Sequence, residues 1–141
     1  MSGSRKKLSD GDYVRLADFR FALRRFLEFS ADAAKGEGLT PRQHQAMLVI
    51  RGSEGGRASV GRLAERLCLR PNTAAELAKR LEAGGWITRI PGEADRRVVV
   101  LALTPAAETK LEHLSHVHRR ELRQIGPEIS ALFQSLAEED E

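Results

Sequence analysis

The sequence predicts a mainly α-helical chain that carries one small β-hairpin. Apolar residues recur at three- and four-residue steps over most of the 141 residues, which is the period of amphipathic helices. Thr-Pro pairs, which favour the start of a helix, occur at residues 40–41 and 104–105. Between residues 86 and 103 the pattern changes to two β-branched runs around a charged turn, and this change indicates a hairpin.

Four helices are predicted before the hairpin, over approximately residues 10–35, 41–50, 60–69 and 71–83. Thr40 and Ser59 are suited to cap the second and third helices, and Pro71 is suited to open the fourth. Three glycines make residues 51–57 a predicted turn. The third and fourth helices are short and separated by a tight junction, so we expect them to form a helix-turn-helix.

The fourth helix has one apolar face and one polar face. The apolar positions that are expected to face the core are Ala74, Leu77, Ala78 and Leu81. The positions that are left to face outward are Asn72, Thr73, Glu76, Lys79 and Arg80. In a helix-turn-helix the N-terminal residues of the second helix contact base edges in the DNA major groove. Asn72 and Thr73 are therefore predicted to contact bases, and simple helix capping is the competing explanation.

The predicted hairpin has strands at residues 86–90 and 98–103, with a charged tip between them. A helix is expected from Thr104-Pro105 to about Ile125, and Gly126-Pro127 is expected to break it. A last amphipathic helix then precedes an acidic tail at residues 138–141. The order of these elements predicts a helix-turn-helix with a β-wing, flanked by N- and C-terminal helices.

Residues 63–67, 69–87, 95–97 and 103–105 together resemble the multiple antibiotic resistance regulator (MarR) family, and the resemblance covers about residues 10–137. It implies a winged helix-turn-helix homodimer with interlocked terminal helices, usually a repressor that a small ligand releases from double-stranded DNA. Within one compact domain, we expect residues 1–36 to be an arm and the first dimerisation helix. Residues 37–104 would form the DNA-binding lobe, and residues 105–141 the C-terminal dimerisation helices with the acidic tail.

The same resemblance places the hairpin tip on DNA. It implies that Arg97 enters the minor groove, that Asp95 orients its guanidinium, and that Arg96 contacts a phosphate. Further phosphate contacts are expected from Arg62, Arg70, Arg80 and Arg89. Many family members carry Thr-Arg where this chain has Ala75-Glu76. A carboxylate repels phosphates but accepts a hydrogen bond from cytosine N4, so Glu76 either contacts a base or is merely solvated.

An effector pocket is predicted where the DNA-binding lobe meets the dimerisation helices, lined by Phe19, Phe26, His44 and Met47, with plain core packing as the alternative. Metal sensing by the histidines His44, His113, His116 and His118 is a lesser alternative, and neither a metal nor a cofactor is expected. The single cysteine, Cys68, excludes an internal disulfide and is expected to be a core thiol.

Charge is distributed unevenly, because residues 51–100 carry ten basic side chains against six acidic ones while the whole chain has a net charge of +3. A basic middle favours a polyanionic partner, although a solvated surface explains charges of this size equally well. No phosphate-binding loop, nucleophile elbow or acid–base pair supports an enzyme. We therefore expect a cytoplasmic DNA-binding regulator without a membrane anchor. The alternative is a protein-interaction module on a winged-helix fold that has lost DNA binding.

Overall fold

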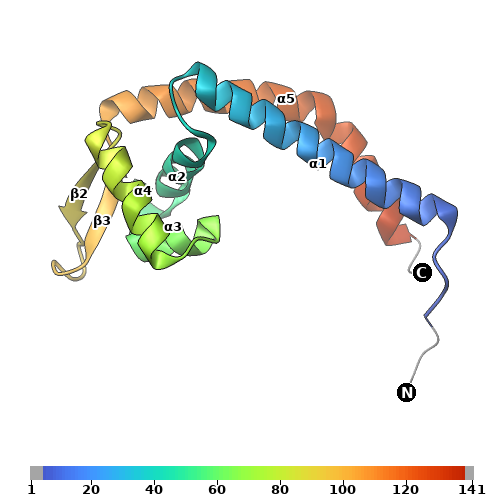
Figure 1. The fold of residues 1–141 in the computed structure, drawn as a ribbon, viewed down its shortest axis with the longest axis horizontal. Coiled ribbons are helices and arrows are strands. Elements are labelled where there is room, and N and C mark those ends of the chain that lie inside the picture. Colours follow the sequence, from blue (N-terminus) through green and yellow to red (C-terminus); the bar gives the residue numbers. More distant parts are fainter. Residues whose placement is uncertain (1–4, 139–141) are drawn as a thin grey trace. The chain divides into compact units, whose positions relative to one another are not determined.

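The computed structural model describes residues 5–138, and Figure 1 shows a mainly helical chain with a small antiparallel sheet, as the sequence predicts. The elements are α1 (Asp10–Gly36), α2 (Pro41–Gly52), the 3-10 helix η1 (Glu54–Gly56), β1 (Arg57–Ala58), α3 (Val60–Leu67), α4 (Pro71–Ala83), β2 (Ile87–Pro91), β3 (Val99–Leu103) and α5 (Pro105–Glu138). Within residues 5–138, no helix is both long and apolar enough to cross a lipid bilayer.

The chain divides into two compact units, and both boundaries lie inside a long helix rather than at the ends of predicted segments. The winged unit, Ala31–Val117, holds the end of α1, helices α2 to α4, the sheet and the start of α5. The two-helix unit holds the chain up to Ser30 and the chain from His118 onward. Each unit is described by itself below.

The winged unit encloses an apolar core between its helices and the sheet. Its largest fully buried side chains are Met47, Ile50, Leu63, Leu81, Ile87, Leu101 and Leu114. The sheet has the strand order β1-β3-β2, with Arg57 opposite Ala102 and Ile87 opposite Leu103. The expectation of a two-stranded hairpin was therefore incomplete, because a third strand, β1, begins at Arg57, the last residue of the predicted turn. The added strand pairs the outer edge of β3, where backbone groups would otherwise lack partners.

Local sequence signals account for the helix starts of the winged unit. The backbone N–H of Gln43 donates to Thr40 Oγ1 at 3.1 Å, and the backbone N–H of Thr40 donates to Gln43 Oε1 at 3.0 Å. These two bonds form a capping box at the start of α2. Ser59 Oγ accepts from the backbone N–H of Arg62 at 3.1 Å and caps α3. Both predicted caps are thus present.

The end of α3 corrects the expectation for Cys68. This residue is the C-cap of α3, with φ at +55° in the left-handed region, and it is exposed. A residue in this conformation lies beyond the helical turn that faces the core, so its side chain leaves the apolar stripe. The prediction of a core thiol was wrong.

In the two-helix unit, α1 and α5 run side by side in opposite directions (Figure 1). The predicted break at Gly126-Pro127 is absent, because α5 continues through Pro127 to Glu138. A proline inside a helix removes one backbone hydrogen bond, which packing on either side can offset. Phe133 lies beyond the proline and packs on Phe19 of α1, with ring centroids 5.2 Å apart. This contact holds the distal part of α5 against α1.

Candidate nucleic-acid interface

Helix α4 presents the polar face that the sequence predicts. Its N-cap is Arg70, whose side chain makes no capping hydrogen bond, and Pro71 occupies the first turn. Asn72 and Thr73 follow inside that first turn and are exposed, so neither residue is the cap of α4. The buried positions are Ala74, Leu77, Ala78 and Leu81, as expected from the apolar pattern.

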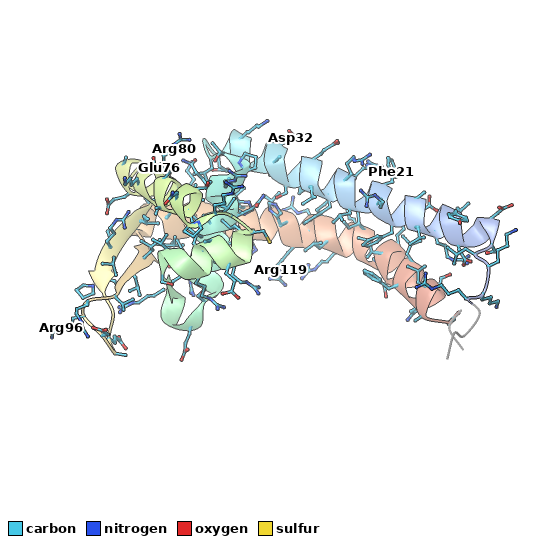
Figure 2. The ribbon with its side chains drawn as sticks, turned by 60° about the horizontal axis from the view of Figure 1, so that its bottom comes forward. Phe21, Asp32, Glu76, Arg80, Arg96 and Arg119 are labelled. Atoms are coloured by element: carbon cyan, nitrogen blue, oxygen red, sulfur yellow. The ribbon has the colours of Figure 1, made fainter. Side chains whose placement is uncertain are left out.

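The exposed face of α4 mixes amide, hydroxyl and charged groups. Glu76 and Arg80 lie on this helix (Figure 2) and are exposed, as are Asn72, Thr73 and Lys79. Lys79 Nζ lies 3.4 Å from Glu76 Oε1, one turn further along the helix. The residues that were singled out as base contacts therefore lie together on one helix, and the capping explanation for Asn72 and Thr73 loses its basis.

The tip between β2 and β3 has a hydrogen-bonded backbone turn and an arginine beside a carboxylate. The backbone N–H of Gly92 donates to the carbonyl oxygen of Val98 at 2.7 Å, and a Cβ at Gly92 would lie only 2.9 Å from the carbonyl oxygen of Asp95. Asp95 Oδ1 accepts from the backbone N–H of Arg97 at 3.0 Å and from Arg97 Nε at 3.3 Å. Arg96 lies at this tip in Figure 2 and is exposed. The Arg97 side chain remains 91% exposed, so its guanidinium lies beside the Asp95 carboxylate and open to solvent.

Two contacts connect β2 and the start of α5 with α4 and the turn that follows it. Arg89 Nε on β2 lies 3.2 Å from Glu82 Oε2 on α4. Thr104 Oγ1 donates to the carbonyl oxygen of Gly85, just after α4, at 2.7 Å. Both contacts bridge the sheet side of the unit and the α4 side. The sequence analysis missed them, because only the folded sheet brings these residues together.

Other arginines of the winged unit also have partners within the chain. Arg57 Nη1 at the start of β1 lies 3.4 Å from Glu93 Oε1 at the wing tip. Arg62 Nε donates to Ser53 Oγ at 3.0 Å. Of the other expected phosphate contacts, Arg62 and Arg89 are engaged in this way, and Arg70 and Arg80 lie on α4 and its cap; all four residues are exposed.

Comparison with known proteins agrees with this geometry. A sequence model described as the MarR family matches residues 37–98, which include α2, the helix-turn-helix and most of the wing. Over this segment the chain is similar to the MarR family. The transcriptional repressor MdtR of Bacillus subtilis is 30% identical to it over 83 residues, which are 59% of this chain and 52% of the repressor. The chain therefore matches about half the length of that curated relative.

Solved MarR structures share the fold. A MarR family protein from Bacillus stearothermophilus has a TM-score of 0.73 at 21% identity, with 94% of this chain and 95% of that one covered. A mutant MarR from E. coli, solved in complex with operator DNA, has a TM-score of 0.68 at 17% identity, with 94% and 98% covered. At these identities the likeness shows the fold alone, which is a winged helix.

The four residues of the predicted effector pocket lie in both units. Phe19 and Phe26 belong to the two-helix unit, where Phe19 packs on Phe133 and the Phe26 ring lies 6.0 Å from that of His118. His44 and Met47 belong to α2 of the winged unit, and both are buried. A pocket shared by these four residues stays a prediction.

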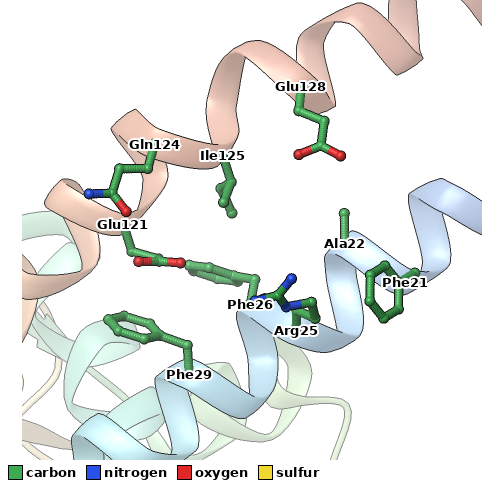
Figure 3. Close-up of a pocket in the computed structure, with 9 residues that line it drawn as sticks. All are labelled: Phe21, Ala22, Arg25, Phe26, Phe29, Glu121, Gln124, Ile125 and Glu128. Atoms are coloured by element: carbon green, nitrogen blue, oxygen red, sulfur yellow. The ribbon is translucent and has the colours of Figure 1, made fainter.

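The two-helix unit has a pocket of its own, with a volume of about 340 Å³ (Figure 3). Phe26 and Phe29 of α1 give it an aromatic wall, and α5 contributes the carboxylates of Glu121 and Glu128. Arg25 and Phe21 also line this pocket, and the guanidinium of Arg25 lies 5.7 Å from the centre of the Phe21 ring. Phe26 is the residue that this pocket shares with the predicted effector site.

The histidines of α5 have neighbours other than one another. His113 Nε2 lies 3.1 Å from Glu37 Oε1, and His118 Nε2 lies 2.8 Å from Ser30 Oγ. Between residues 5 and 138, no three His, Cys, Asp or Glu side chains gather into a group that could hold a metal ion. The described part of the chain therefore gives no geometric support to metal sensing.

Proposed function

We propose that this chain is a transcriptional regulator of the MarR family that binds double-stranded DNA, with α4 in the major groove and the wing tip in the minor groove. The exposed face of α4 carries the proposal, because Asn72, Thr73 and Arg80 lie uncovered on a helix whose other face is buried. Asn pairs well with the N6 and N7 atoms of adenine, and the negative potential of a narrow minor groove attracts arginine. Arg97, held by Asp95, suits that groove, and Arg70 and Arg96 suit phosphates.

The regulator is proposed to act as a homodimer. The two-helix unit exposes large apolar side chains at Leu8, Tyr13, Val14, Leu16, Phe21, Leu23, Leu27, Leu122 and Phe133. Apolar surface of this extent on a water-soluble chain is typical of an interface. A second copy related by a twofold axis would cover it and would place two α4 helices on DNA about one turn apart, ~34 Å. The matching operator would be pseudo-palindromic.

Repression and release by a ligand complete the proposal. MdtR is named a repressor and matches 59% of this chain, which favours repression over activation. A ligand releases DNA only under one condition. It must bind the DNA-free conformation of the protein more tightly than it binds the DNA-bound conformation. The predicted effector pocket at Phe19, Phe26, His44 and Met47 is the site proposed for such a ligand. If a His44 or Met47 variant kept both its stability and its ligand response, that residue would not line the effector pocket.

A salt titration of DNA binding tests the proposed function. The purified chain is titrated with fragments of the DNA upstream of its own gene at several salt concentrations. Binding through several phosphates predicts that log K falls with log salt by about 0.9 for each phosphate neutralised. The absence of any salt-dependent DNA binding would favour the alternative, a protein-interaction module on a winged-helix fold.

A further inference from the structure

One acidic side chain lies on the face of α4 that is proposed to meet DNA. Glu76 is exposed, whereas its neighbours on that face are neutral or basic. A carboxylate that approaches a polyanion is repelled by the phosphates, so Glu76 weakens binding to DNA of any sequence. Its presence there calls for a compensating contact with a particular base.

The helical spacing places Glu76 in line with the predicted base contacts. Residues three and four apart share one side of a helix, so Glu76 lies on the same stripe as Thr73 and Asn72 before it and Arg80 after it. A rise of 1.5 Å per residue puts Glu76 about 6 Å beyond Asn72 along the axis of α4. Successive base pairs are roughly 3.4 Å apart, so Glu76 would face a base one or two pairs away from the base that Asn72 contacts.

Two ion pairs on α4 show why Glu76 rather than Glu82 suits this contact. Glu82 is engaged by Arg89 of the wing at 3.2 Å, which commits that carboxylate to the contact between helix and wing. Glu76 is paired with Lys79 at 3.4 Å, and the two side chains are 65% and 68% exposed. A pair this exposed is held weakly, so exchanging it for another partner costs little. Lys79 is also placed to contact a phosphate once Glu76 turns to a base.

We propose that Glu76 is a specificity-determining residue that accepts a hydrogen bond from the N4 amino group of a cytosine in each half-site. The inference rests on the proposed function. In the major groove, cytosine offers an amino donor, whereas guanine offers only acceptors. A carboxylate, which is only an acceptor, therefore favours cytosine and disfavours guanine. Combined with repulsion by phosphates, this contact raises the ratio of specific to non-specific binding.

The test couples a protein variant to a base change. The wild-type chain selects its preferred site from a randomised DNA library, and the same selection is run with Glu76→Gln and with Glu65→Gln. Glu65 is exposed on α3, so its substitution removes the same charge from the winged unit without touching α4. The wild type and Glu65→Gln are expected to select the same cytosine one or two pairs from the Asn72 contact. Glu76→Gln, whose amide suits adenine, is expected to lose that preference.

Affinity measurements on the selected site complete the test. Replacing the C·G pair with T·A should weaken wild-type binding by roughly ten-fold and leave Glu76→Gln binding almost unchanged. Glu76→Gln should also bind non-specific DNA more tightly than the wild type does. Equal base preferences in all three proteins, or a selected site without cytosine at that position, would overturn the role of Glu76 and leave the proposed function intact. A wild-type chain that selects no sequence would overturn both.

Discussion

The winged unit and the two-helix unit differ in how far their apolar side chains are buried. Among the described residues, every buried hydrophobic side chain lies between Ala34 and Leu114, inside the winged unit. The two-helix unit instead exposes aromatic residues such as Tyr13, Phe21 and Phe133, each more than half exposed. Two helices share a single line of contact, whereas several helices and a sheet can surround a core.

The difference indicates two kinds of partner surface. The winged unit encloses an apolar core and offers water a polar and basic face on α4 and the wing tip. The two-helix unit leaves apolar surface in contact with water. Burying this surface against another chain would lower the free energy of the complex. We therefore expect variants of the two surfaces to separate DNA binding from dimerisation, and the predictions below test this separation.

The largest effect is expected for a core substitution in the winged unit. Leu81 is fully buried, so Leu81→Ala should lower the free energy of unfolding by about 2–5 kcal/mol. Leu48→Ala is the matched control in the same unit. Because Leu48 is 51% exposed, this substitution should lower the free energy of unfolding much less. Chemical denaturation at one fixed protein concentration measures both, since the stability of a dimer depends on concentration. Similar losses in the two variants would contradict the core described above.

The next effect concerns the apolar surface of the two-helix unit. Phe21→Glu places a charge on that surface and should raise the dimer dissociation constant by roughly 30-fold, as loss of a buried aromatic contact at an interface does. Sedimentation equilibrium measures the dissociation constant. Lys35→Ala is the control, because it changes the net charge by the same amount. Lys35 is exposed in the last turn of α1, within the winged unit, so its replacement should leave the dimer dissociation constant unchanged. A wild-type chain that is monomeric at micromolar concentration would refute the dimer.

A third prediction concerns the wing tip. Arg97→Ala should weaken DNA binding by about 1–3 kcal/mol, because it removes a charge and a groove contact. Asp95→Ala should also weaken binding, though less, because the guanidinium loses the carboxylate that orients it. Simple electrostatics predicts the opposite sign for Asp95→Ala, since removing a carboxylate near DNA reduces repulsion.

DNA titrations of the two wing variants at one salt concentration decide between these signs. Both variants should fold and dimerise as the wild type does, because the tip is exposed and contributes little to the core. Tighter binding by Asp95→Ala, or unchanged binding by Arg97→Ala, would show that the wing tip is only a solvated turn.

The smallest effect is expected at the capping box of α2. Thr40→Ala removes the oxygen that accepts from the backbone N–H of Gln43 and should lower the free energy of unfolding by about 1 kcal/mol. Thr109→Ala is a suitable control, because its exposed hydroxyl donates to the carbonyl of Pro105 within α5 and caps nothing. Thermal unfolding of both variants measures the difference. An equal loss at Thr109 would show that the cap contributes nothing specific.

The sequence by itself determined the features that depend on neighbouring residues. The caps at Thr40 and Ser59 and the two faces of α4 follow from contacts within three or four positions, which is the range that periodicity and capping patterns describe. The contact between Asp95 and Arg97 also spans only two positions, although the family resemblance rather than a local pattern predicted it. For this reason much of the candidate interface could be predicted without coordinates, including which residues of α4 face outward.

Only the tertiary structure decided the features that join distant parts of the chain. Strand β1 has two residues and exists because β3, more than forty positions later, supplies its hydrogen-bonding partners. Helix α5 continues through Pro127, and Phe133 beyond the proline packs on Phe19 of α1. The pairing of Glu82 with Arg89 likewise needs the wing to fold back beside α4. These outcomes depend on packing between segments, which overrides local preference and leaves no signal in a short stretch of sequence.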